Sequence, residues 1–183
     1  MLYEVENKFP VDDLESLAQR LTAYGAQFDE AIEQVDHYFA HPVRDFAQTD
    51  EALRIRRIGQ CNLVTYKGPK IDRATKTRRE LELPLATGGE LTQQYVQLLQ
   101  ALGFRSVADV KKRRRCGRFT WQHWHVEATL DEVEGLGRFA ELEIQAVADT
   151  LRDAQTALVA LAAELGLTIV ERRSYLEMLL ESR

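Results

Sequence analysis

The first residues of the chain alternate in a way that restricts the fold more than any other feature of the sequence. Residues 1–9 read as a β-strand, in which successive side chains point to opposite faces, so Glu4, Glu6 and Lys8 share one face and apolar residues take the other. A half-buried strand usually turns its apolar residues inward and its charges to water. Alone, the pattern is therefore typical of a solvated edge strand, and its weight comes from its repetition.

The same alternation of charged and apolar residues recurs along the chain. In the strand predicted over residues 52–58, Leu53 and Ile55 face one way while Arg54 and Arg56 face the other. Over the predicted strands the charged face carries Glu4, Glu6, Lys8, Arg54, Arg56, Lys67, Arg78, Glu80, Glu82, Lys112, Arg114, Glu127, Asp131, Glu141 and Glu143. Periodicity does not decide which of two basic rows points inward in residues 104–115, so both stay open.

The other elements follow from helical spacing and turn residues. Further strands are predicted over residues 26–32, 33–40, 61–67, 77–85, 121–131 and 138–147, and helices over 10–24, 90–102, 151–165 and 174–181. Residues 41–50 are predicted to be a loop, and 70–76 a polar, mobile connection. Residues 1–183 are predicted to form one domain, since no repeat or low-complexity linker divides them.

Composition excludes several classes of protein. With 45% hydrophobic and 29% charged residues the chain is expected to be soluble, and no apolar run is long enough to cross a bilayer, so a cytoplasmic protein without a membrane partner is expected. A net charge of -5 argues against general nucleic-acid binding. Cys61 and Cys116 lack CxxC spacing, so free thiols are expected rather than a zinc site. The sequence leaves the oligomeric state open, a homodimer included.

The charged faces are expected to meet. If helices cover the apolar faces, about eight strands could close into a barrel whose charged interior holds one small ligand. Open sheets with their charges in bulk water are an equally good interpretation of periodicity alone. A lumen lined by both acidic and basic side chains would suit phosphoryl transfer. Guanidinium and ammonium groups neutralise a polyphosphate, while carboxylates hold Mg²⁺ or Mn²⁺. The chain contains no glycine-rich GxxxxGK[ST] phosphate loop, so side chains would bind the phosphates.

An ordered set of motifs resembles the CYTH family, named for class IV adenylate cyclases and thiamine triphosphatases. The motifs are Glu4-Val5-Glu6-Asn7-Lys8, Leu53-Arg54-Ile55-Arg56, Tyr66-Lys67-Gly68-Pro69, Arg79-Glu80-Leu81-Glu82, Val110-Lys111-Lys112-Arg113-Arg114, Leu130 to Gly137 and Phe139-Ala140-Glu141-Leu142-Glu143. A single ExExK is weak, but the set spans nearly the whole chain in order. The resemblance implies an α+β fold: a closed antiparallel eight-stranded β-barrel, the triphosphate tunnel, with helices packed outside.

The resemblance also implies roles for individual residues. The implied metal-binding residues are Glu4, Glu6, Glu141 and Glu143, with Glu80, Glu82 and Asp131 as further acidic residues of the metal site. The implied phosphate-binding residues are Lys8, Arg54, Arg56, Lys67, Lys112 and Arg114, of which Lys8, Arg56, Lys112 and Arg114 are candidate catalytic residues. Arg78 joins the substrate-binding set, and Glu127 the acidic row, on strand parity alone. The family pattern makes Lys112 and Arg114 the inward row.

Three functions remain open from the sequence. The first is a class IV adenylate cyclase-like enzyme that converts ATP to cyclic AMP and pyrophosphate with Mg²⁺ or Mn²⁺. The second is a triphosphatase acting on inorganic triphosphate, thiamine triphosphate or a nucleoside triphosphate. The third is a non-catalytic module that binds polyphosphate or nucleotide. Participation of His123, His125 or Tyr175 in the site stays undecided.

Overall fold

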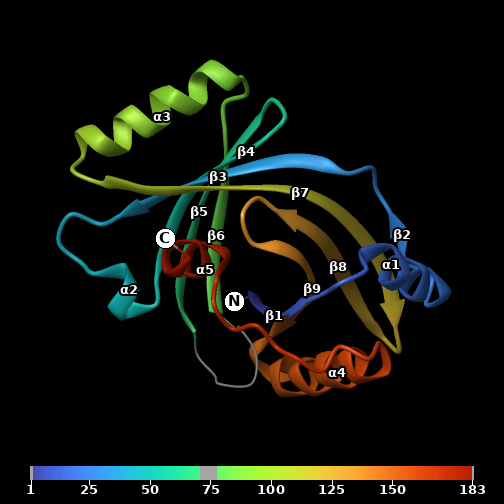
Figure 1. Cartoon of the computed structure of the whole chain (residues 1–183). Helices are drawn as coiled ribbons and strands as arrows, with labels where there is room; N and C mark the ends of the chain where they lie inside the picture. Colours follow the sequence, from blue (N-terminus) through green and yellow to red (C-terminus); the bar gives the residue numbers. More distant parts are fainter. Residues whose placement is uncertain (1, 71–77, 183) are drawn as a thin grey trace.

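The computed structural model describes residues 2–70 and 78–182. Eight strands form a closed antiparallel barrel in the order β7-β3-β4-β5-β6-β1-β9-β8, and pairing of β8 with β7 closes the ring (Figure 1). They are β1 (Leu2–Pro10), β3 (Ile32–Ala40), β4 (Ala52–Ile58), β5 (Cys61–Lys70), β6 (Arg78–Leu85), β7 (Arg105–Trp121), β8 (Trp124–Val133) and β9 (Gly137–Val147). The prediction of a closed barrel is therefore confirmed. The alternative of open sheets is ruled out, because pairing of β8 with β7 leaves no free edge in the ring.

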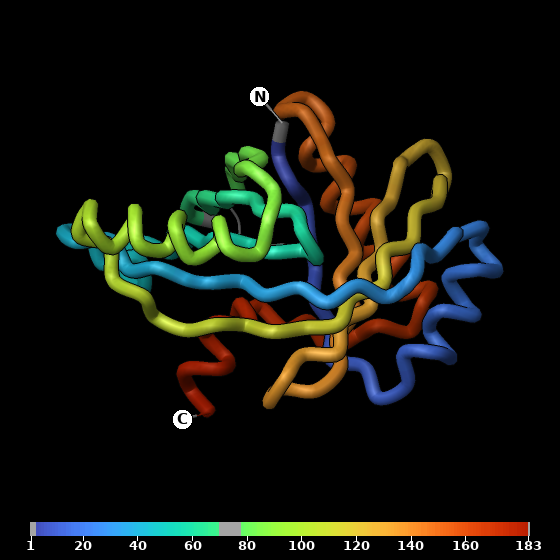
Figure 2. Tube along the Cα trace, turned by 90° about the horizontal axis from the view of Figure 1, so that it is seen from above, coloured from blue at the N-terminus to red at the C-terminus, as the bar shows by residue number. Residues whose placement is uncertain are grey.

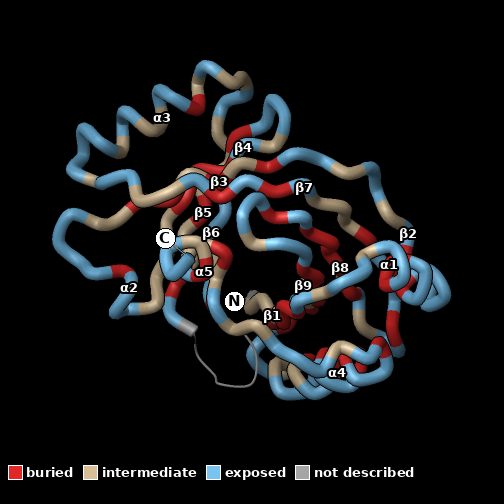
Figure 3. The backbone as a smooth tube through the Cα atoms, viewed as in Figure 1, coloured by how far each residue is buried: buried red, intermediate tan, exposed pale blue. Residues whose placement is uncertain are grey.

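Two helices cover the apolar outer face of β1, β8 and β9. They are α1 (Leu14–Ala23) and α4 (Leu151–Glu164), preceded by the short 3-10 helix η1 (Ala148–Thr150). Leu17 and Leu21 of α1 and Leu158 and Leu161 of α4 are fully buried in one core with the outward apolar row of these strands. Figure 3 shows this burial where α1 and α4 face the barrel. Asp13 begins α1 by accepting the backbone N–H groups of residues 15 and 16.

Three further helices lie around the other side of the barrel. The helix α3 (Gly89–Ala101) packs against β4, β5 and β7, and the one-turn helix α2 (Phe46–Thr49) lies between β3 and β4. In the view of Figure 1 the helix α5 (Tyr175–Glu181) lies over the interior of the ring. Its Tyr175 and Met178 are buried with Tyr38, Val110 and Phe139 in a second, smaller core. Figure 2 shows the beginning of β1 and the end of α5 on opposite sides of the molecule.

Several predicted boundaries are wrong. The strand expected over 121–131 begins at Trp124, because β7 continues to Trp121 and the chain turns at Gln122, whose φ is 55°. The strand expected over 26–32 shrinks to β2 (Gln27–Phe28), an extra strand on β7. The predicted loop over 41–50 contains α2, because Asp45 caps two backbone N–H groups. The expected mobile connection over 70–76 lies, beyond its first residue, outside the described residues.

Candidate active site inside the barrel

The barrel encloses a cavity of about 300 Å³ that is lined mainly by charged side chains. Its carboxylates are Glu4, Glu6, Glu80, Glu82, Glu127, Glu141 and Glu143, and its cations are Lys8, Arg54, Arg56, Lys67, Arg78, Lys112 and Arg114, seven of each. The structure thus brings together every predicted site residue except Asp131, which lies fully buried directly beside the lining. Arg78 and Glu127, placed by parity alone, also line the cavity.

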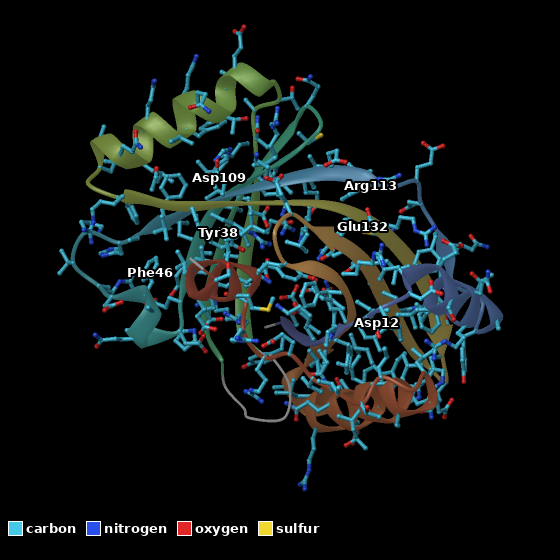
Figure 4. All side chains as sticks on the ribbon, viewed as in Figure 1. Asp12, Tyr38, Phe46, Asp109, Arg113 and Glu132 are labelled. Atoms are coloured by element: carbon cyan, nitrogen blue, oxygen red, sulfur yellow. The ribbon has the colours of Figure 1, made fainter. Side chains whose placement is uncertain are left out.

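The lining settles which basic row of β7 points inward. Lys112 is 3% exposed and Arg114 faces the cavity, whereas Lys111 and Arg113 are exposed on the outer surface. In Figure 4, Arg113 and Glu132 mark these outward rows of β7 and β8. This division follows from the alternation of a strand: residues two apart share a face, so Lys112 and Arg114 point inward together while Lys111 and Arg113 point outward.

Three carboxylates form a cluster on β1 and β9. Glu4, Glu6 and Glu143 each offer an oxygen, and these oxygens lie within 4.8 Å of one another. Burial, then the charges of Glu4 and Glu6, raises the pKa of Glu143 to about 9. Burial also raises the pKa of Glu4, although Lys67 opposes this at 3.0 Å from its Oε2. Like charges this close are costly without a cation, and the donor set suits a hard divalent ion such as Mg²⁺ or Mn²⁺.

A buried carboxylate that the sequence analysis missed holds two of the predicted cations. Asp36 of β3, 1% exposed, accepts hydrogen bonds from Arg56 Nε and Nη2 at 2.7 and 2.8 Å and from Arg54 Nη1 at 3.3 Å. Burial alone would raise the pKa of Asp36, but Arg54 and Arg56 hold it well below its usual range. Arg54 also donates to the hydroxyl of Tyr38, at 3.4 Å. Asp36 therefore fixes where both guanidinium groups point.

A second buried carboxylate, Asp131 of β8, lies on the other side of β7 from Asp36. Asp131 accepts Arg114 Nε at 2.6 Å and the Tyr175 hydroxyl at 2.8 Å, and it lies 3.6 Å from Lys112 Nζ. Arg114 donates as well to Glu141. Burial and the neighbouring charge of Arg114 lower the pKa of Lys112 to about 7. Because its oxygens face these partners, Asp131 is placed to orient cations.

Lys8 connects the first strand to the C-terminal segment. Its Nζ donates to the backbone carbonyl of Arg173 at 2.5 Å and lies 4.0 Å from the centre of the Tyr175 ring. The backbone N–H of Glu171 donates to the carbonyl of Lys8 at 2.7 Å. Tyr175, undecided from sequence, therefore lines the lumen and contacts two of its cationic groups.

The remaining predicted residues occupy the side formed by β5 and β6. Lys67 Nζ lies between Glu4 and Glu80, at 3.0 and 2.5 Å, and Arg54 approaches Glu80 at 3.9 Å. Glu82 accepts the hydroxyl of Thr65 at 2.9 Å. His123 and His125 are exposed at the β7–β8 turn or just after it.

The sequence did contain a signal that Asp36 faces the lumen. Asp36 and Tyr38 alternate with Val35, His37 and Phe39, which is the pattern of a strand with two different faces.

Comparison with known proteins agrees with this geometry. The CYTH domain family matches residues 2–175. The chain belongs to the CYTH family. A relative named "Putative adenylate cyclase MJ0240", from Methanocaldococcus jannaschii, is 41% identical over 78% of this chain and 77% of its own length. "Adenylate cyclase CyaB" from Aeromonas hydrophila is 30% identical over 94% of this chain and 86% of its own.

A solved structure also shares the fold of this CYTH protein. The PH1819 protein from Pyrococcus horikoshii OT3 is 39% identical, with a TM-score of 0.83 over 98% of this chain and 99% of that chain. Among the described residues, none of the helices has both the length and the apolar character needed to span a lipid bilayer.

Proposed function

We propose that this CYTH protein is a divalent-metal-dependent enzyme that binds a triphosphate compound inside its barrel and cleaves it in an adenylate cyclase-like reaction. The observation that carries the proposal is the charge balance of the lumen, which has seven carboxylates and seven cations. A triphosphate adds several negative charges to this balanced set. Because uncompensated buried charge is strongly unfavourable, the phosphates need cations that accompany them.

The carboxylate cluster supplies a place for those cations. Glu4, Glu6 and Glu143 would hold Mg²⁺ or Mn²⁺, since three oxygens within 4.8 Å form the donor set that such ions prefer. Glu80, Glu82 and Glu141 would extend this acidic side. A bound ion would neutralise phosphate charge and favour departure of the leaving group. In this proposal Asp131 orients Arg114 and Tyr175 instead of coordinating metal, because it already accepts hydrogen bonds from both.

The cationic residues would bind and align the phosphates. Arg54 and Arg56 are held by Asp36, and Arg114 by Asp131, so their remaining N–H groups are preorganised for phosphate oxygens. Lys8, Lys67, Arg78 and Lys112 would add charge around the chain of phosphates. Rate enhancement would come mainly from positioning and electrostatic stabilisation, with Lys8, Arg56, Lys112 and Arg114 nearest the reacting groups.

In the cyclase reaction the 3′-hydroxyl of ATP attacks the α-phosphorus, the bond from that phosphorus to the bridging oxygen breaks, and pyrophosphate leaves. The hydroxyl proton leaves with solvent or a nearby base. The names of the two relatives support this reaction as the first candidate. A triphosphatase, in which water attacks a terminal phosphorus, is the second candidate. It is favoured by the lining itself, which is suited mainly to phosphate groups.

Product analysis tests the proposal. Purified protein would be incubated with ATP, and separately with inorganic triphosphate, in Mg²⁺ or Mn²⁺, and its products compared with those of Glu4→Gln. Cyclic AMP with pyrophosphate supports the cyclase, and orthophosphate the triphosphatase; Glu4→Gln should form neither. Tight triphosphate binding without turnover would make the protein a binding module, and absence of both binding and turnover would refute a triphosphate site.

A further inference from the structure

The segment that joins α4 to α5, residues 165–174, meets the first strand of the barrel at Lys8 (Figure 1). Two hydrogen bonds join them. The backbone N–H of Glu171 donates to the carbonyl of Lys8 at 2.7 Å, and Lys8 Nζ donates to the carbonyl of Arg173 at 2.5 Å. Lys8 itself is 1% exposed and lines the lumen. The segment therefore holds both the backbone and the ammonium group of a predicted phosphate-binding residue.

The peptide group between Arg173 and Ser174 is held at both of its polar atoms. Its carbonyl oxygen accepts the hydrogen bond from Lys8 Nζ, and its N–H donates to Glu177 Oε2 at 2.5 Å. Ser174 Oγ accepts the backbone N–H of Glu177 in return, at 3.1 Å, which completes a capping box at the start of α5. Hydrogen bonds at the two ends of one peptide group polarise each other, so this carbonyl is a strengthened acceptor for the ammonium group.

The carboxylate of Glu171 holds the residue that carries this carbonyl. It accepts the backbone N–H of Arg173 at 2.8 Å, and Nε and Nη2 of the same residue at 2.9 and 2.5 Å. The hydrogen bonds from the Arg173 side chain are the main cause that lowers the pKa of Glu171 to about 2, and the nearby charge of Lys8 acts in the same direction. An ionised carboxylate thus closes residues 171–173 into a compact turn.

The position of the Lys8 ammonium group depends on this turn. A lysine side chain is a long, flexible stem with a compact charge at its end, so its place on β1 alone does not fix where the charge lies. The carbonyl of Arg173 binds the ammonium group, and the ring of Tyr175 lies 4.0 Å from it. An ammonium group held in this way loses less conformational freedom when it binds a phosphate oxygen, and binding is tighter by that amount.

We propose that Glu171 is a positioning residue for phosphate binding: its carboxylate holds the turn of residues 171–173, and the turn fixes the ammonium group of Lys8 in the lumen. This inference rests on the proposed function and adds to the site a residue from outside the barrel strands. Glu171 would act through the backbone carbonyl of Arg173, without contact with the substrate. Loss of its carboxylate would let the ammonium group take other positions, so a triphosphate would bind more weakly.

A double-mutant cycle tests this route. Calorimetry in Mg²⁺ would measure the dissociation constant of inorganic triphosphate with both bridging oxygens replaced by methylene groups, which prevents hydrolysis. Wild type would be compared with Glu171→Gln, which keeps the size of the side chain but removes its charge, with Lys8→Met, which keeps the stem but removes the ammonium group, and with the double variant. Lys8→Gln takes the place of Lys8→Met where the latter fails to fold. The matched control is Glu181→Gln, because Glu181 also pairs with Arg173, at 2.7 Å, but lies outside the turn and is 59% exposed.

Glu171→Gln should weaken binding about fivefold and Lys8→Met about 30-fold, because a charge-assisted hydrogen bond is misplaced in the first and lost in the second. In the Lys8→Met background Glu171→Gln should add less than about twofold, since no ammonium group is left to position. Glu181→Gln should bind within about twofold of wild type.

A residue that only stabilises the fold would weaken binding by the same factor in both backgrounds. That result, or unchanged binding in Glu171→Gln, would overturn the inference while the proposed function stands. If wild type does not bind the triphosphonate, the proposed function fails, and the inference fails with it.

Discussion

Arg56 forms two parallel hydrogen bonds with Asp36, at 2.7 Å from Nε and 2.8 Å from Nη2. The same carboxylate accepts a hydrogen bond from Arg54, and it is 1% exposed. One buried acid thereby sets the direction of two guanidinium groups that line the lumen. Breaking a buried ion pair on one side leaves the other charge uncompensated, which is more costly than the pair itself is favourable.

Replacement of this acid should destabilise the fold. Asp36→Asn keeps the shape of the side chain but leaves the buried charges of Arg54 and Arg56 without their carboxylate partner, so the free energy of unfolding at pH 7 should fall by about 3 kcal/mol. Urea unfolding measures the change. The control Asp109→Asn changes a half-exposed carboxylate of β7 paired with His37, and it should cost about 1 kcal/mol or less. Equal stability of the two variants would contradict the role of Asp36.

The stabilisation by Asp36 should also depend on pH. Its pKa in the folded protein is well below its ordinary value of 3.8, so the unfolded chain takes up the proton first on acidification. The stability that the carboxylate contributes is therefore fully present above about pH 4 and is lost as the pH falls toward the folded pKa. The difference in unfolding free energy between wild type and Asp36→Asn should shrink between pH 4 and pH 2. A difference that stays constant over this range would contradict the shift.

Removing one acid of the cluster should separate stability from metal binding. Glu143→Gln replaces a carboxyl that is ionised in the unfolded chain at pH 7 but takes up a proton when it is buried beside Glu4 and Glu6, so the metal-free protein should unfold at the same or a higher temperature than wild type. Added Mn²⁺ should raise the Tm of wild type but not that of the variant, whose activity should fall about 100-fold or more. The control Glu132→Gln removes an exposed acid of β8 and should respond to Mn²⁺ as wild type does. Equal Mn²⁺ stabilisation of Glu143→Gln would remove this residue from the metal site.

Neighbouring arginines of β4 offer a matched test of phosphate binding. Arg56 lines the lumen, while Arg57, the next residue, is exposed outside the barrel. Arg56→Ala should weaken binding of inorganic triphosphate at least about tenfold, because a charge-assisted bond is lost from a buried site. Arg57→Ala should change binding less than about twofold. The two dissociation constants, measured by calorimetry in Mg²⁺, would contradict the assignment if they changed equally.

The hydroxyl of Tyr175 should contribute to the order of the lumen. Tyr175→Phe removes the hydrogen bond to Asp131 but keeps the ring beside Lys8, so stability should fall by only about 1 kcal/mol. Turnover should fall more than binding does, because Asp131 and Arg114 lose a group that fixes their positions. Steady-state kinetics, with a fall in kcat at nearly constant KM, would support this. Unchanged kinetics would make Tyr175 a packing residue.

Much of the fold could be predicted because alternation is a local property of a strand. The charged rows that contain Glu4, Arg54 and Glu141 were visible in the sequence, and the CYTH resemblance then favoured a closed barrel and the inward position of Lys112. The predicted ends of the strands were less accurate than their faces. The turn at Gln122, for example, needs a positive φ that the surrounding alternating residues do not announce.

The sequence by itself determined which side chains share a face, because the period of a strand depends only on local backbone geometry. Tertiary structure decided which of those side chains meet. Asp36 and Arg56 meet because β3 pairs with β4 in a register that places them side by side. Asp131 and Tyr175 meet because the C-terminal helix packs against the barrel near β8. Such contacts depend on closure of the barrel and on docking of α5. Long-range packing, which has no local signature in the sequence, therefore decided the ion pairs of the lumen.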